Sequence, residues 1–155
     1  MSPITLSSLD RLPPQNLEAE QSVLGCLMLD KDAIIKIADL IIVDDFYDVR
    51  HRTIYENILI LFEKSTSIDI LTLSNILEER KLLDAVGGSS YLSTLVNIVP
   101  TAAHVVNYAS IIRKKGTLRR LITSATEITS LAYKEEGDVE QILDIAEQRL
   151  FQVSQ

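Results

Sequence analysis

Apolar residues recur every three or four positions along most of the chain after residue 15, whereas no stretch of useful length alternates apolar and polar positions. The first spacing places apolar side chains on one face of a helix, and an alternating pattern would indicate strands. The chain is therefore predicted to be all-α. Between residues 16 and 100 capping and breaking residues separate five apolar stripes, which predicts five helices. Leu17 in the first and Phe62 in the third are expected on the apolar faces.

The expected helix ends follow from these capping and breaking residues. The first helix follows Asn16, the second is capped by Asp30, the third covers residues 50–64, the fourth starts at Asp69 or Thr72, and the fifth is capped by Ser89 or Ser90 and ended by Pro100. The β-branched run 40–43 could form a short strand, but we interpret it as the end of the second helix before a turn at Asp44–Asp45.

A much longer helical pattern runs from Thr101 to about Tyr133, without proline and with Gly116 as its one glycine. A helix of about 30 residues would be about 45 Å long, whereas a compact domain of this size is about 30 Å across. Part of this helix is therefore expected to project or to pack against something else. A turn at residues 135–137 and an N-cap at Asp138 predict one more helix after it.

Together these elements predict a globular five-helix head over residues 16–100, followed by a projecting two-helix hairpin over residues 101–155. Residues 1–15, which carry three prolines, are expected to be a flexible arm. No internal repeat is visible.

Charge is unevenly distributed along the 155 residues, whose formal net charge is −7. Residues 105–134 carry six cations and one anion, and residues 135–155 carry six anions and one cation. Opposite charges on two antiparallel helices can pair within one hairpin, or they can fix the pairing of hairpins from different subunits. The two interpretations are compatible.

The sequence lacks the common catalytic motifs: no glycine pair has the spacing of a P-loop, and neither a dinucleotide-binding glycine motif nor an HExxH motif is present. His51 and His104 are interpreted as surface or boundary residues, and Cys26 as an inert core thiol. We expect no catalytic, cofactor or metal site in this chain. No run of 18 apolar residues exists, so no membrane association is expected.

The best candidate for nucleic-acid contact is a basic stretch in the long helix, although the acidic balance of the chain disfavours a stand-alone nucleic-acid binder. Its members are Arg113, Lys114, Lys115, Arg119 and Arg120. No aromatic residue lies among them for base stacking. Direct DNA binding through Arg113–Arg120 is therefore kept as the alternative function.

Several segments, in order, resemble the N-terminal part of bacterial replicative DNA helicases of the DnaB family. They are RLPPQNLEAEQSVLG (11–25), DDFYDVRHRTIYENI (44–58), IDILTLSNILEER (68–80), GGSSYLSTL (87–95), PTAAHVVNYASIIR (100–113), LRRLI (118–122) and AEQRLFQVSQ (146–155). Each segment is weak alone, but their order and spacing make the resemblance specific. One departure is His104, where the family more often has asparagine.

The resemblance implies a non-catalytic domain that works in DNA replication, in the bacterial cytoplasm at the replication fork. In the family this domain dimerises through its hairpin, forms a trimer of dimers within a hexamer, and docks the C-terminal domain of primase in the primosome. A helicase loader is a further candidate partner. ATP, Mg²⁺ and DNA are bound by the family's motor domain, which would make the parent protein an ATP-dependent helicase.

The resemblance also implies candidate contact residues. Those for primase docking are Tyr91, Ile122 and Ile128, for which plain core or hairpin packing is an equally good interpretation. Those expected for self-association of the hairpin are Ile112, Leu121, Ala125, Ile142, Leu143 and Leu150.

Overall fold

The computed structural model describes residues 11–155, and within this range it contains helices and no strand. The all-α prediction is therefore confirmed. The expected arm lies mostly outside the described residues, since residues 1–10 are not among them. No helix in the described part of the chain is long and apolar enough to span a membrane.

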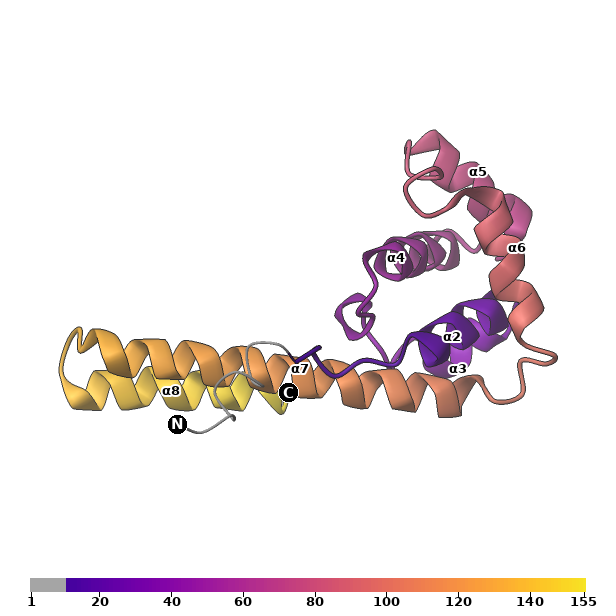
Figure 1. Cartoon of the computed structure of the whole chain (residues 1–155). Helices are drawn as coiled ribbons and strands as arrows, with labels where there is room; N and C mark the ends of the chain where they lie inside the picture. Colours follow the sequence, from indigo (N-terminus) through magenta and orange to yellow (C-terminus); the bar gives the residue numbers. More distant parts are fainter. Residues whose placement is uncertain (1–10) are drawn as a thin grey trace. The chain divides into compact units, whose positions relative to one another are not determined.

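Seven α-helices and one 3₁₀ turn follow one another along residues 11–155 (Figure 1). They are α2 (Leu17–Leu29), α3 (Ala33–Ile37), η1 (Val43–Asp45), α4 (Val49–Glu63), α5 (Ile70–Glu79), α6 (Gly88–Ile98), α7 (Val105–Lys134) and α8 (Val139–Val153). The chain divides into two compact units. One spans Gln15–Lys114, and the other combines Lys115–Gln155 with the N-terminal residues up to Pro14.

Three of the expected N-caps are confirmed, each by a side-chain oxygen that accepts a backbone N–H of the first helical turn. Asn16 accepts from Ala19 at 2.9 Å, Asp69 from Thr72 at 2.9 Å and Asp138 from Gln141 at 2.9 Å. Such caps satisfy N–H groups that have no partner inside the helix. The helices that they start are α2, α5 and α8.

The second expected helix differs from the prediction at both ends. It begins after Asp32 rather than Asp30, and it ends at Ile37. The turn expected at Asp44–Asp45 is confirmed as η1, where the N–H of Ile42 donates to Asp45 Oδ2 at 2.9 Å. This side-chain acceptor offers the backbone an alternative to further helix.

Two other helix starts were predicted wrongly. The N-cap of α6 is Gly87, whose φ is +105°, rather than Ser89 or Ser90. The long helix begins at Val105, four residues after Thr101, whose hydroxyl accepts the N–H of Ala103 at 3.2 Å.

The unit Gln15–Lys114 is the five-helix head, and it also includes the start of α7. Val105, Ala109 and Ile112 lie on one face of α7 and are buried in the core of this unit. The boundary between the units therefore lies at Lys114–Lys115 rather than at residues 100–101. Leu17 and Phe62, both expected on apolar faces, are 39% and 38% exposed because they lie in the end turns of their helices.

Helix α2 is the central helix of the head, with buried residues on most of its surface. It approaches α6 closely at Gly25, where an added Cβ would lie 2.2 Å from the carbonyl oxygen of Leu95. Glycine therefore lets the two helix backbones come together at this point.

The second unit is a helical hairpin, in which the part of α7 after Lys114 lies beside α8 (Figure 1). The connecting turn is confirmed: α7 ends at Lys134, α8 begins at Val139, and Glu135 and Gly137 have positive φ values of 52° and 86°.

Candidate functional site

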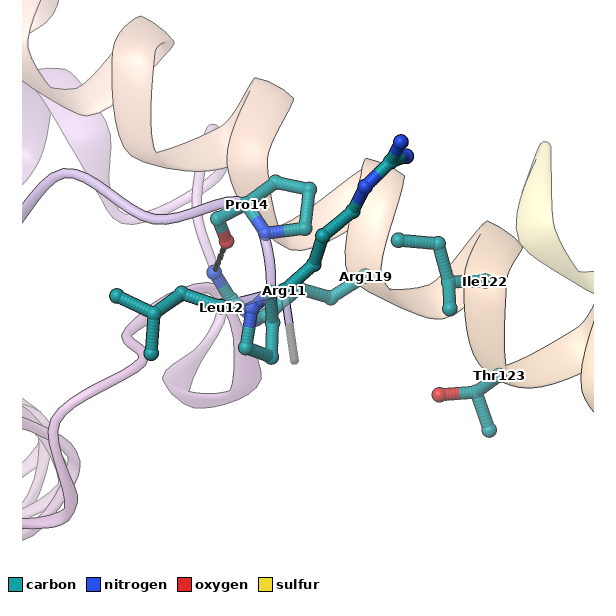
Figure 2. A pocket seen from close by; sticks show the side chains of 7 residues that line it. Arg11, Leu12, Pro14, Arg119, Ile122 and Thr123 are labelled. Atoms are coloured by element: carbon teal, nitrogen blue, oxygen red, sulfur yellow. Dashed lines mark hydrogen bonds between the residues drawn. The ribbon is translucent and has the colours of Figure 1, made fainter. Parts of the chain in front are cut away.

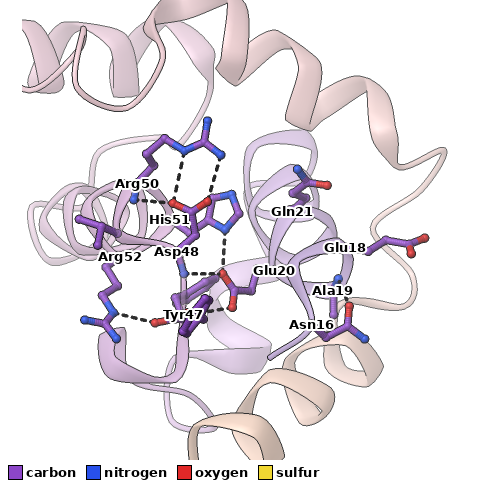
Figure 3. Close-up of polar contacts among 12 residues, drawn as sticks. Asn16, Glu18, Ala19, Glu20, Gln21, Tyr47, Asp48, Arg50, His51 and Arg52 are labelled. Atoms are coloured by element: carbon purple, nitrogen blue, oxygen red, sulfur yellow. Dashed lines mark hydrogen bonds and ion pairs between the residues drawn. The ribbon is translucent and has the colours of Figure 1, made fainter. Parts of the chain in front are cut away.

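A buried carboxylate and a buried imidazole form the polar centre of the head. Glu20 of α2 is 1% exposed and His51 of α4 is 0% exposed, and His51 Nδ1 lies 2.8 Å from Glu20 Oε1. The carboxylate also accepts the backbone N–H of Tyr47 at 2.7 Å and that of Asp48 at 3.2 Å. Figure 3 shows these bonds converging on Glu20. Because every donor is matched, a charged group can remain in the core here.

The same imidazole reaches a tyrosine of α6. His51 Nε2 lies 2.7 Å from the hydroxyl of Tyr91, and the two rings are nearly parallel, with centroids 6.0 Å apart. Gln21 Nε2 also donates to this hydroxyl, at 3.4 Å. Tyr91 is partly exposed. Its hydroxyl is therefore held by the core while part of the side chain remains at the surface.

An arginine that forms an ion pair lies over the ring of Tyr91. The guanidinium of Arg50 lies 4.4 Å from the ring centroid of Tyr91, a cation–π distance, and it pairs with Asp48 at 3.0 Å. Burial raises the pKa of Asp48, but the hydrogen bonds from Arg50 and the positive charge of its guanidinium outweigh this effect, so the pKa lies below its ordinary value. Arg50 is thus fixed over the ring by a carboxylate that stays ionised.

Tyr91 packs against Gly87, where the absence of a side chain makes room for it. A Cβ at this position would lie 2.8 Å from Tyr91 Cβ, and the φ of +105° is itself unfavourable for other residues. The sequence GGSSYL therefore serves two purposes: its first glycine starts α6, and the absent side chain makes room for Tyr91. We call Glu20, His51, Tyr91, Arg50 and Asp48 the Tyr91 cluster.

The hairpin offers a different surface, which is apolar. Leu121 of α7 and Leu150, Phe151 and Val153 of α8, with Glu147 and Ser154, line an open groove of about 420 Å³. None of the 15 residues of α8 is buried. An amphipathic helix normally buries its apolar face, so this face of α8 lacks the cover that its sequence pattern predicts.

An ion pair between the two hairpin helices joins Arg149 of α8 to Glu127 of α7. These are the single cation of residues 135–155 and the single anion of residues 105–134. This ion pair thus joins the one cation of the acidic helix to the one anion of the basic helix, which the charge pattern did not predict.

A second hairpin feature is a pocket of about 480 Å³ between the N-terminal segment and α7. Arg11, Leu12, Pro13 and Pro14 line one side, and Arg119, Ile122 and Thr123 line the other. Arg119 Nη1 donates to the carbonyl oxygen of Pro14 at 2.8 Å, and Figure 2 draws this bond as a dashed line. One member of the basic stretch is therefore bound to the chain's own N-terminal segment.

Comparison with known families decides which class of protein has this fold. The family model described as "DnaB-like helicase N terminal domain" matches residues 12–114. The chain belongs to this family. The matched range ends where the head ends, at Lys114.

Replicative helicases of known name match almost the whole chain. This DnaB-like domain is 44% identical over 146 residues to the replicative DNA helicase DnaC of Bacillus subtilis (strain 168) and 40% identical over 146 residues to DnaB of Geobacillus stearothermophilus. Each alignment covers 94% of this chain but 32% of the relative. The chain thus spans about a third of the length of the curated relatives it matches.

Solved structures agree on the fold. The crystal structure of the N-terminal domain of DnaB helicase from Mycobacterium tuberculosis has a TM-score of 0.87 and 40% identity, with 91% of this chain and 99% of that chain covered. A DnaB-like replicative helicase, solved in work on its interactions with primase, has a TM-score of 0.76 at 22% identity, covering 89% of this chain and 31% of that chain. The DnaB-like identification made from sequence is therefore confirmed.

Most of the residues expected at interfaces of this DnaB-like domain lie at the surface of the hairpin. Ile122, Leu143 and Leu150 are 51%, 55% and 53% exposed, Leu121 and Ala125 are also exposed, and Ile128 and Ile142 are half-buried. Ile112 differs, because it is 1% exposed and belongs to the core of the head. Its burial follows from its place on the α7 face that also carries Val105 and Ala109.

The basic stretch does not present five equivalent cations. Arg113 and Lys114 are exposed, whereas Lys115, Arg119 and Arg120 are half-buried. Arg120 donates to Thr117 Oγ1 at 3.4 Å. Direct DNA contact by this stretch remains the alternative function.

Sequence reasoning missed the centre of the Tyr91 cluster. The expectation that His51 is a surface or boundary residue is wrong, and Glu20 was treated only as a first-turn acid. A signal was present: Glu20 shares a helix face with Leu24 and Leu27, and His51 shares one with Ile54 and Ile58. A charged or polar residue on an apolar face predicts a buried polar pair.

Cys26 is buried, as expected, and its Sγ lies 3.8 Å from the carbonyl oxygen of Thr101. Burial, and then the negative charge of Asp30, raise the pKa of this thiol, which disfavours the reactive thiolate. No group of three or more potential metal ligands occurs among the described residues.

Proposed function

We propose that this domain of a replicative helicase has two tasks: it joins subunits through the hairpin, as a dimer and then as a trimer of dimers in a hexamer, and it docks the C-terminal domain of primase. The observation that carries the first task is that α8 has no buried residue. The one that carries the second is Tyr91, a partly exposed aromatic residue held in place by a buried polar cluster.

A second copy of the hairpin is the occupant that fits the uncovered face of α8. The face is apolar at Leu143, Leu150 and Phe151, which are all exposed. The majority charges are opposite on the two helices, and residues such as Asp144 and Glu147 are exposed. Two copies can therefore bring cationic and anionic helices together while covering the apolar face.

Sedimentation equilibrium over a range of concentrations tests self-association. We expect the wild type to dimerise and Leu150→Asp to shift the chain to monomer, because a carboxylate would be buried in the interface. Gln148→Asp, an exposed position on the same helix, is the matched control and should dimerise like the wild type. A monomeric wild type at the highest concentration contradicts the proposal, and circular dichroism verifies that each variant keeps its helices.

Primase docking is supported by the position of Tyr91, by the exposure of Ile122, and by the neighbouring helicase that was solved with attention to its interactions with primase. Apolar and aromatic side chains at the surface are the usual anchors of protein interfaces. Ile122 and half-buried Ile128 would supply a second contact region on the hairpin. A helicase loader is a further proposed partner.

A titration with the C-terminal domain of the cognate primase tests docking. Tyr91→Ala and Ile122→Asp should each weaken binding, by about tenfold or more as expected for interface anchors. Asn97→Ala on α6 and Ser130→Asp on α7 are exposed control positions and should bind like the wild type. Wild-type affinity in both test variants removes these residues from the site.

The proposal assigns no chemistry to this chain. ATP and Mg²⁺ would be bound elsewhere in the full-length helicase, at the replication fork in the bacterial cytoplasm, and DNA would be gripped there rather than here.

A further inference from the structure

We propose that Glu20 and His51 are positioning residues for Tyr91: they tie its hydroxyl into the core in one direction, so that a docking partner meets an immobilised ring rather than a free phenol. This inference rests on the proposed docking function. It goes beyond it by assigning a role to two buried residues that cannot touch a partner.

The hydrogen-bond partners of the neutral imidazole determine which of its two nitrogens carries the proton. Both carboxyl oxygens of Glu20 already act as acceptors, for the backbone N–H groups of Tyr47 and Asp48. The 2.8 Å contact with His51 Nδ1 is therefore a hydrogen bond that Nδ1–H donates. In a neutral imidazole the other nitrogen, Nε2, must then be the acceptor.

The hydrogen bond between His51 and Tyr91 has a defined direction. With Nε2 as acceptor at 2.7 Å, the hydroxyl of Tyr91 donates its one proton inward. Gln21 Nε2 donates to the same oxygen at 3.4 Å. The hydroxyl is thereby engaged as donor and as acceptor within the head, and the chain Tyr91 to His51 to Glu20 ends on a carboxylate.

These contacts hold the ring of Tyr91 in place. A tyrosine that is held only at its Cβ can change rotamer, whereas here the hydroxyl is also hydrogen-bonded to His51, and the guanidinium of Arg50 lies 4.4 Å from the ring centroid. A side chain ordered before binding loses less entropy on binding. Arg50 pairs with Asp48 and lies over the ring, but its side chain is 43% exposed, so this surface offers a partner the guanidinium together with the exposed part of the ring.

Two substitutions of His51 separate positioning from folding. Asparagine places an amide nitrogen at the same number of bonds from Cβ as Nδ1, so His51→Asn can keep the bond to Glu20 and loses Tyr91. Glutamine reaches the Nε2 position, so His51→Gln can still accept from Tyr91. Tyr91→Phe keeps the ring and removes only the tether.

The test measures affinity for the C-terminal domain of the cognate primase, with thermal melts of each variant as the control for folding. We expect about fivefold weaker binding for Tyr91→Phe and for His51→Asn, as for one lost hydrogen bond. The double variant should be no weaker than either single one, and His51→Gln should recover part of the affinity. A merely structural role would track the melting temperature and would not show this recovery.

The measured affinities distinguish the positioning of Tyr91 from primase docking itself. If Tyr91→Ala weakens binding but Tyr91→Phe and His51→Asn bind like the wild type, docking stands and positioning is overturned. If the wild type does not bind, both are overturned.

The direction of the hydrogen bonds can be tested separately by NMR, since the chain has only two histidines to assign. A ¹⁵N spectrum of the imidazoles, assigned with His104→Gln, should show the Nδ1–H tautomer for His51, and an Nε2–H tautomer contradicts the assignment.

Discussion

Glu20 sits at a helix position where its neighbours on the same face are leucines, yet it is the acceptor for three donors of the head. Two of these are backbone N–H groups of the segment that leads into α4, at Tyr47 and Asp48. The side chain thus ties α2 to the start of α4 and to His51. A buried charge whose partners are all in place is tolerated, whereas removing the charge leaves those partners without an acceptor.

We expect Glu20→Ala to lower the free energy of unfolding by about 3–5 kcal/mol, because the N–H donors of Tyr47, Asp48 and His51 would lose their acceptor in the core. Urea denaturation followed by circular dichroism measures this. Glu18→Ala, at an exposed position on the same turn of α2, is the matched control and should change stability by less than about 0.5 kcal/mol. Equal effects of the two variants would show that Glu20 acts only through helix propensity.

At the scale of elements, the packing of α2 against α6 depends on the absence of a side chain at Gly25. A Cβ added at this residue would lie 2.2 Å from the carbonyl oxygen of Leu95. Backbone cannot give way as the end of a flexible side chain can, so the two helices would have to move apart.

Gly25→Ala therefore tests the α2–α6 contact, because the two possible effects change the free energy of unfolding in opposite directions. Helix propensity alone would stabilise the protein by about 1 kcal/mol, whereas overpacking should destabilise it by about 1–3 kcal/mol. We expect the second result in equilibrium unfolding. An increase in stability would mean that α2 and α6 are not in close contact at this residue.

Elements that are specified locally could be predicted from sequence. The caps at Asn16, Asp69 and Asp138 and the helical periodicity gave the existence and order of the helices, because a cap and an amphipathic stripe act within one or two turns. Features that depend on distant partners were missed. The bond between His51 and Glu20, and the burial of Ile112, need residues that lie far apart in sequence.

At the scale of the whole molecule, the basic stretch of α7 belongs to a chain whose net charge is −7. Within the stretch, Arg119 donates to Pro14, and no aromatic side chain lies between the cations. Phosphate binding through released counterions requires several cations that act together.

We expect this chain to show no measurable binding to forked DNA in a fluorescence anisotropy titration, even at low salt, where phosphate contacts are strongest. The comparison protein is the double variant Arg113→Ala, Lys114→Ala, which removes the two exposed cations of the stretch. Binding by the wild type that weakens with salt and is lost in the double variant would favour the alternative DNA-binding function.

The uncovered face of α8 has a consequence for how the molecule melts. A partner that binds only the folded form raises its melting temperature with concentration. The part of the helical signal contributed by the hairpin should therefore melt at higher temperature in more concentrated solutions, and Leu150→Asp should abolish this dependence; circular dichroism melts at several concentrations measure both. Unchanged melting of the wild type would contradict self-association. The stability of α8 then depends on the protein concentration, because each chain needs a second chain to cover the apolar face of this helix.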